Sequence, residues 1–190
     1  MKTMQRLRHL LFISFLSLLS ASAMACRCEW QGPFSWVSED ADLVVLARFG
    51  DVQKGNWRDV QVEDTLRGEN FEDFVRIWGK YQDYCRVNVD TFPPGTRWVL
   101  ALSRIDKIPE KGFNPATPGV SYGRVGDYSM SQCGAYWLSE KNGMVTGNIT
   151  TMVDWDWDPL MDPVPYDVIK AFVNGEATYV DIIKHSNEIT

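Results

Sequence analysis

The alternation of apolar and polar residues predicts a chain built mainly of short β-strands. Alternating or β-branched apolar runs are typical of strands, and they recur at 42–50, 58–66, 74–78, 96–102, 135–138 and 144–149. Residues rich in Gly, Pro and Asn separate these runs at 54–56, 67–69, 93–95 and 142–143. The pattern therefore predicts a mainly β, antiparallel domain of five to six strands, either a small barrel or a sandwich.

Helices are expected only in short stretches. Residues 34–40 could form one or two helical turns. A helix is predicted at 165–173, with Pro165 in its first turn and Gly175 at its end. Residues 178–184 suit a second short helix or an added strand. The connection at 104–129 has no sustained period, and a loop of that length is typically functional or disordered rather than packed.

The first 25 residues have the three parts of a signal peptide. Basic residues precede an apolar run at 10–19, and Ala23 and Ala25 occupy the positions that signal peptidase reads. The run is short for a membrane span. We therefore expect a signal peptide at 1–25, a domain at 26–150, a C-terminal extension at 151–190, and a secreted or periplasmic protein. The alternative is a lipoprotein anchored through Cys26, although Ala23 and Met24 depart from that pattern.

The charge of the chain restricts the classes of partner that we expect it to bind. The sequence has 19 basic and 25 acidic residues, a net charge of −6. The leader holds three basic residues and no acidic ones, so its removal leaves 16 against 25, a net −9. Nucleic acids and anionic membranes bind surfaces on which Lys and Arg are clustered. We therefore expect a protein partner, no nucleic acid, and no membrane unless Cys26 is lipidated.

All four cysteines follow the leader: Cys26, Cys28, Cys85 and Cys133. An even number in an exported chain indicates two disulfides. A bridge between Cys26 and Cys28 is the least favoured pairing, because two cysteines one residue apart on an extended chain bridge only with strain. The alternative is a four-cysteine zinc site, but the spacing lacks the paired Cys-x-x-Cys of zinc ribbons.

The sequence offers little catalytic chemistry, and we expect no enzyme and no cofactor. Only His185 remains after the leader is removed, and the common hydrolase, zinc-protease and phosphate-loop motifs are missing from the sequence. The sharpest acidic cluster comprises Asp154, Asp156 and Asp158, interleaved with tryptophans. It predicts either a solvated acidic edge or, as a distant alternative, a carboxylate enzyme. Pro159 and Pro165 stand where an EF-hand requires Gly and Glu.

Several segments, taken in chain order, carry a resemblance to a known family. A Cys-x-Cys directly after the leader is followed by a short helical stretch and by Ala-Asp-Leu-Val-Val-Leu-Ala-Arg-Phe at 41–49. Later come Arg-Gly-Glu at 67–69, Cys85, Gly-Thr-Arg-Trp-Val-Leu-Ala-Leu at 95–102, and Cys133. Together these segments resemble the tissue inhibitors of metalloproteinases and the related netrin-like domains. The resemblance implies a five-stranded OB-type barrel with Cys26 bridged to Cys85 and Cys28 to Cys133.

The resemblance also implies a mechanism of inhibition. In that family the amine and carbonyl of the first cysteine, here Cys26, chelate the catalytic zinc of a metalloprotease, and the next side chain, here Arg27, enters the specificity pocket. The family carries a small residue there, and a buried guanidinium requires a carboxylate beside it. The alternative is a non-inhibitory cell-envelope module that contacts protein or glycan through the 104–129 loop or through Trp155 and Trp157.

Overall fold

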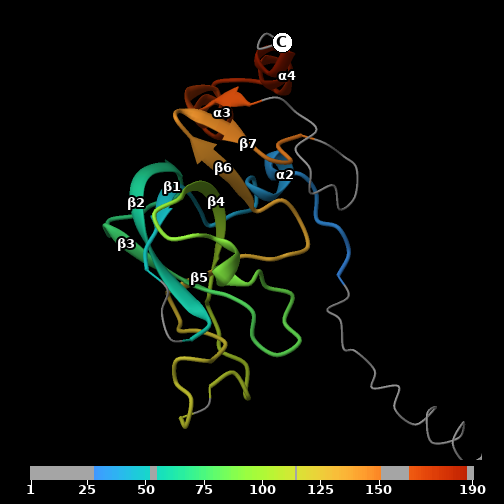
Figure 1. Cartoon of the computed structure of the whole chain (residues 1–190). Coiled ribbons are helices and arrows are strands. Elements are labelled where there is room, and N and C mark those ends of the chain that lie inside the picture. The colour runs from blue at the N-terminus through green and yellow to red at the C-terminus, as the bar shows by residue number, and fades with distance from the viewer. Residues whose placement is uncertain (1–27, 52–54, 114, 151–162, 188–190) are drawn as a thin grey trace, which may run out of the picture.

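The computed structural model describes residues 28–51, 55–113, 115–150 and 163–187 of the 190-residue chain (Figure 1). Strands dominate this part of the chain, and the helices are short. The predicted signal peptide and the Asp154, Asp156 and Asp158 cluster lie outside the described residues.

Five strands close into a barrel, which confirms the predicted fold class. They are β1 (Leu43–Phe49), β2 (Trp57–Arg67), β3 (Phe74–Trp78), β4 (Arg97–Arg104) and β5 (Tyr128–Ser129). Strand β1 pairs antiparallel with β2 along one edge and with β4 along the other. The circuit continues from β2 to β3, then through a parallel β3–β5 pair, and returns from β5 to β4. This is an OB-type barrel with no free edge on β1.

Three further strands extend the sheet beyond β4. They are β6 (Trp137–Lys141), β7 (Met144–Thr146) and β8 (Val164–Pro165). Strand β6 pairs antiparallel with β4, β7 with β6, and β8 with β7. The tight turn between β6 and β7 uses Asn142 and Gly143, both at positive φ, as the sequence predicts.

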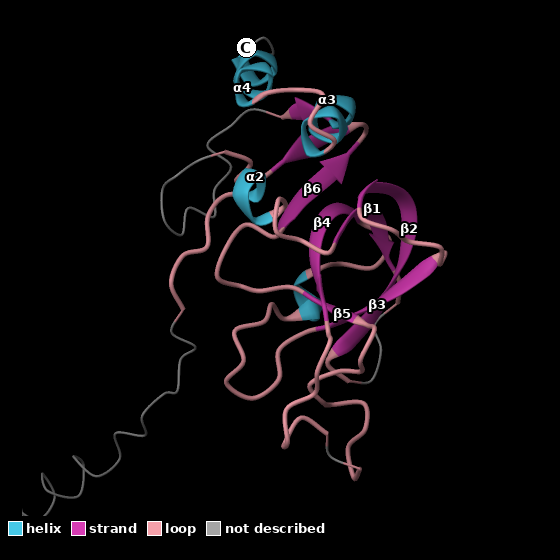
Figure 2. Cartoon of the chain, turned by 180° about the vertical axis from the view of Figure 1, so that it is seen from behind, coloured by secondary structure: helices cyan, strands magenta, loops and turns pink. Residues whose placement is uncertain are grey.

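The helices are short and lie before, between and after the strands. Helix α2 (Phe34–Val37) precedes β1, and a single 3₁₀ turn, η1 (Val89–Thr91), follows β3. Helices α3 (Tyr166–Val173) and α4 (Tyr179–Asn187) confirm the helix predicted at 165–173 and decide in favour of a helix at 178–184. Seen from behind, α3 and α4 lie at the β6 end of the molecule, away from β5 (Figure 2).

Two apolar clusters form the core, and β1 and β4 contribute to both. Alternate residues of β1, such as Leu43 and Val45, pack inside the barrel with Leu100 of β4. The residues between them, such as Val44, pack on the outer face with Ala101 of β4. This two-sided burial explains why the sequence of β1 is an almost unbroken apolar run rather than an alternating one.

The C-terminal helices pack into the outer cluster and lie beside β2, β7 and β8. Ile169, Val173 and Ile182 are buried in the outer cluster, beside Phe34 of α2. Polar contacts add to this packing, because the Asp64 carboxylate on β2 accepts hydrogen bonds from Tyr166 (2.9 Å) and Lys170 (2.6 Å) on α3. The described residues after 163 therefore belong to the same core as the barrel.

The long connection between β4 and β5 packs against the barrel, so the prediction of disorder does not hold for its described residues, while the alternative of a functional loop stays a prediction. Asp127 accepts a hydrogen bond from the indole of Trp78 at 2.7 Å. Gly123, at φ +132°, lies so close to Trp78 that an added Cβ would be 2.9 Å from its ring. Trp78 is therefore buried although it shares a face of β3 with exposed Phe74. Local alternation could not show this, because the cover comes from residues far along the chain.

We predict that Ile169→Ala destabilises the protein by about 3 kcal/mol, because it empties a fully buried site in the outer cluster. Urea unfolding measures this difference. The control is Val180→Ala on α4, whose side chain is 69% exposed and which should change stability by less than about 0.5 kcal/mol. Equal, small effects of both substitutions would show that α3 contributes nothing to the core.

We also predict an acid-dependent contribution from Asp64. Burial acts to raise the pKa of this carboxyl, but hydrogen bonds from Lys170 and Tyr166 outweigh it and hold the pKa below its usual value. A lowered folded pKa means that the contribution is complete above about pH 4 and is lost as the pH falls through the folded value. The stability difference between the wild type and Asp64→Asn, measured by urea unfolding at several pH values, should therefore shrink in acid. A difference that stays constant would contradict the ion pair.

Candidate functional site

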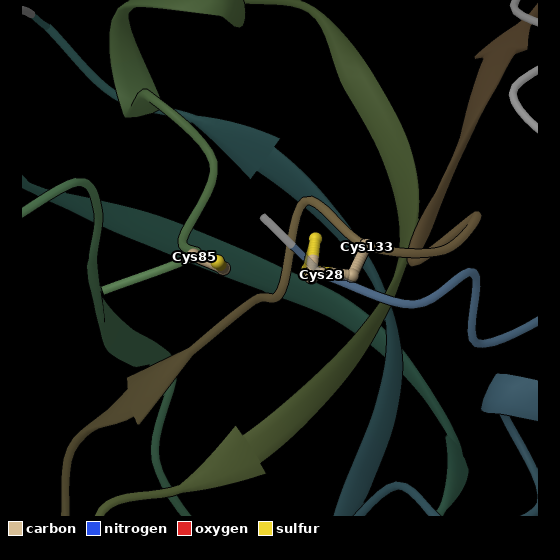
Figure 3. Close-up of side chains that lie close together, drawn as sticks. All are labelled: Cys28, Cys85 and Cys133. Carbon is tan, nitrogen blue, oxygen red and sulfur yellow. A yellow bond between two sulfur atoms is a disulfide. The ribbon is translucent and has the colours of Figure 1, made fainter. Parts of the chain in front are cut away.

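The candidate site is the N-terminal segment at 28–32, which is fixed to the connection between β5 and β6. Cys28 forms a disulfide with Cys133, 105 positions further along the chain (Figure 3). The backbone reinforces the bond, because the amide of Gln31 donates to the carbonyl of Cys133 at 2.7 Å and the amide of Ala135 donates to that of Gly32 at 3.0 Å. The segment therefore runs beside residues 133–135 with little freedom to move.

Helix α2 anchors the far end of this segment. The amides of Phe34 and Ser35 donate to the carbonyls of Asn148 and Ile149, just after β7, at 3.0 and 2.9 Å. The Phe34 side chain is fully buried in the outer cluster. The path from Cys28 to α2 is thus held at both ends by the barrel and its outer layer.

Glycine makes the close approach between the two backbones feasible. A Cβ on Gly134 would lie 3.1 Å from the carbonyl oxygen of Gly32 and 3.2 Å from the Gln31 side chain. Gly32 itself adopts φ +112°, in the region that side chains rarely enter. A side chain at position 134 would push the N-terminal segment away from this connection, whereas a side chain at position 32 would meet the Trp36 ring, with its Cβ 2.9 Å from Cε3.

Cys85 lies beside the Cys28–Cys133 bridge. The sulfur atoms of Cys28, Cys85 and Cys133 all lie within 4.8 Å of one another, and Figure 3 shows Cys85 entering from a different segment of the chain. Its carbonyl accepts a hydrogen bond from the Gln132 amide at 3.0 Å. Cys85 is also disulfide-bonded. The bonded sulfurs support the disulfide prediction over the zinc alternative, which needs all four as free thiolates.

A buried arginine, Arg86, directly follows Cys85 in the chain. Arg86 stacks its guanidinium on the ring of Tyr122, 3.8 Å from the ring centroid, and donates to the carbonyl of the same residue. Burial lowers the pKa of Arg86, and contacts with Tyr122 offset part of that effect. Residue 86 also forms an isolated bridge with Ser131. The residue after Cys85 is therefore held by contacts with both Tyr122 and Ser131.

The remaining predicted site residues have different outcomes. Cys26 and Arg27 lie outside the described residues, so the Cys26–Cys85 pairing and the role of Arg27 stay predictions. Asp154, Asp156 and Asp158 also lie outside the described residues. Asn148 opens an Asn-x-Thr sequence of the kind that accepts N-linked glycans, but its side-chain amide atoms are buried in this structure. In the folded chain this amide is therefore not exposed at the surface.

Sequence reasoning missed a cavity next to the N-terminal segment. Its volume is about 510 Å³, and it is lined by Gln31, Trp36, Val37, Glu39, Asp40 and Tyr136. The available signal was Trp36, a large aromatic residue followed, after Val37, by polar and acidic residues at 38–40. Tyr136 comes from a distant part of the chain, so only the fold could reveal this wall of the cavity.

No family model matches the chain, and the searches of curated proteins and of solved structures find no match either. In the part of the chain that the structure describes, none of the helices has the length and apolar character needed to cross a membrane. The arrangement of the site itself is therefore the basis for any functional proposal.

We predict that replacing Cys28 and Cys133 together by serine lowers the free energy of unfolding by about 4 kcal/mol, because their bond closes a loop of roughly a hundred residues in the unfolded chain. Denaturant unfolding without reductant measures the loss. The two variants Cys28→Ser and Cys133→Ser, made separately, serve as controls, since each should lose the same bond. An unchanged unfolding midpoint in the double variant would contradict this role of the bridge.

Proposed function

We propose that this chain is an exported, non-enzymatic inhibitor that binds a zinc metalloprotease through the amine and carbonyl of Cys26. The observation that carries the proposal is the Cys28–Cys133 bridge, which fixes the chain two residues after Cys26 to a closed OB-type barrel. A rigid chain terminus on a small barrel is well suited to enter a partner's active-site cleft.

The chemistry requires only groups that the N-terminal residue itself carries. An α-amine with a pKa of about 8 loses its proton readily to a zinc ion. Together with the carbonyl oxygen of the same residue, it closes a five-membered ring around the metal. The disulfide reduces the conformational freedom lost on binding, which favours tight association.

Arg27 determines which protease would be inhibited. In an extended segment, the side chains of residues 26 and 28 point to one side and the side chain of residue 27 to the other. With Cys28 turned toward Cys133, the Arg27 side chain would face the partner. Since a buried guanidinium is stabilised only by an opposite charge, we expect a target whose specificity pocket contains a carboxylate.

A second candidate function is a non-inhibitory binding module of the cell envelope. It is supported by apolar side chains on the packed β4–β5 connection, where Phe113, Val120 and Val125 are exposed, the last at 62%. Such residues on an ordered loop suit contact with another protein. This function would not depend on the N-terminal amine.

One experiment separates the two functions. The chain beginning at Cys26 is compared, against a panel of zinc metalloproteases, with a variant that carries one alanine ahead of Cys26. We predict that the extra residue abolishes inhibition, because it converts the chelating amine into an amide that cannot bind the zinc ion in this way.

The matched control is Glu29→Gln, which alters an exposed side chain of the same segment and leaves the amine intact. Its inhibition should equal that of the wild type. A non-reduced peptide map confirms that the disulfides are unchanged in each variant. If both N-terminal forms inhibit equally, or neither does while a partner still binds, the chelation mechanism is wrong.

A further inference from the structure

The cavity beside the N-terminal segment combines an aromatic ring with two carboxylates. Trp36, on α2, is 53% exposed although its neighbours Ser35 and Val37 are buried. Glu39 and Asp40 follow Ser38, the residue that ends α2, and line the same cavity. The amide of Glu39 donates to the carbonyl of Trp36 at 3.0 Å, so this part of the chain still follows the helical path.

The fold holds the Trp36 ring in place. A Cβ added to Gly32 would lie 2.9 Å from the Cε3 atom of Trp36, so the indole packs directly on the backbone of the N-terminal segment. Tyr136 also lines the cavity, and its hydroxyl donates to the side chain of Gln31 at 3.0 Å. The ring positions are therefore set before any ligand arrives.

The negative charge in the cavity is not neutralised within the described residues. Neither Glu39 nor Asp40 forms a salt bridge there, whereas Asp59, Glu63, Asp64 and Glu140 are each paired with Arg or Lys. Burial raises the pKa of the Tyr136 hydroxyl, and the charge of Asp40 adds to the effect, which agrees with the placement of Asp40 toward the cavity.

We propose that this cavity binds the side chain of an arginine presented by a partner protein. A guanidinium stacks on an indole and donates to carboxylates in one plane, which suits a ring flanked by two acidic residues. The net charge of −6 favours a basic partner in the same way. This inference goes beyond the proposed function, because it does not involve the amine of Cys26.

The test uses a peptide pair that differs only in charge. The full chain, labelled with ¹⁵N, is titrated with acetyl-Gly-Arg-Gly-amide and, separately, with the same peptide carrying the neutral isostere citrulline. The indole N–H resonance of Trp36 is identified by its loss in Trp36→Phe. We expect the arginine peptide to shift this resonance and to reach saturation, while the citrulline peptide does not.

Two variants locate the site. Asp40→Asn should weaken binding of the arginine peptide about tenfold, because it removes a charge-assisted hydrogen bond. The matched control Asp73→Asn removes the same charge from an exposed position on the turn between β2 and β3, and should leave the affinity unchanged.

Three results would overturn the proposal: no saturable shift, an equal response to citrulline, or an equal loss in both aspartate variants. A chain with one alanine ahead of Cys26 distinguishes this proposal from the inhibitor mechanism. It should bind the arginine peptide as the wild type does, even where it no longer inhibits a protease.

Discussion

The structure depends on the burial of both faces of β1. Its two edges are occupied by β2 and β4, and every residue except Arg48 is buried. One set of side chains fills the barrel and the other set carries the outer layer. A strand used in this way cannot tolerate a polar residue at most positions, since an unpaired polar group on either face would be cut off from water. The closed barrel and the layer outside it therefore depend on the same strand.

This shared strand is also what positions the N-terminal segment. The outer face of β1 and β4 supports α2 through Phe34 and Val37, and the same cluster takes in α3 and α4. The segment at 28–32 lies between that layer and the disulfide at Cys133. Its orientation thus results from packing at one end and a covalent bond at the other. Neither restraint alone would fix the direction in which the chain leaves the barrel.

Local patterns in the sequence were sufficient for the strands and the turns but not for what covers them. The apolar run at 42–50 has a strong local signal and forms β1 as predicted. The Pro-Pro-Gly turn at 93–95 also has a strong signal, and the strand predicted after it forms as β4. The burial of Trp78 depends on residues 123 and 127, and a pattern of period two gives no information about a loop so far away. For the same reason the sequence could not show that Ile169 packs against the barrel.

The candidate site was predictable to a similar extent. The number of cysteines indicated two disulfides, and the family resemblance gave the pairing of Cys28 with Cys133, which the structure confirms. The cavity was not foreseen, because Trp36 and Tyr136 are a hundred positions apart and meet only through the path of the N-terminal segment. A pattern along the chain can identify an unusual aromatic residue, but the groups opposite it depend on the fold.

The distribution of charge links the fold to its surroundings. Arg58 and Arg86 are buried and donate to backbone carbonyls, and Arg67 bridges the carbonyls of Ser38 and Val173. Arg48 and Arg97 hold Glu63 between them. These five arginines already bind carbonyl or carboxylate oxygens of the chain itself, so they do not neutralise acidic groups elsewhere on the surface. Acidic side chains such as Glu39 and Asp40 form no salt bridge among the described residues. A positively charged group of a partner would neutralise them.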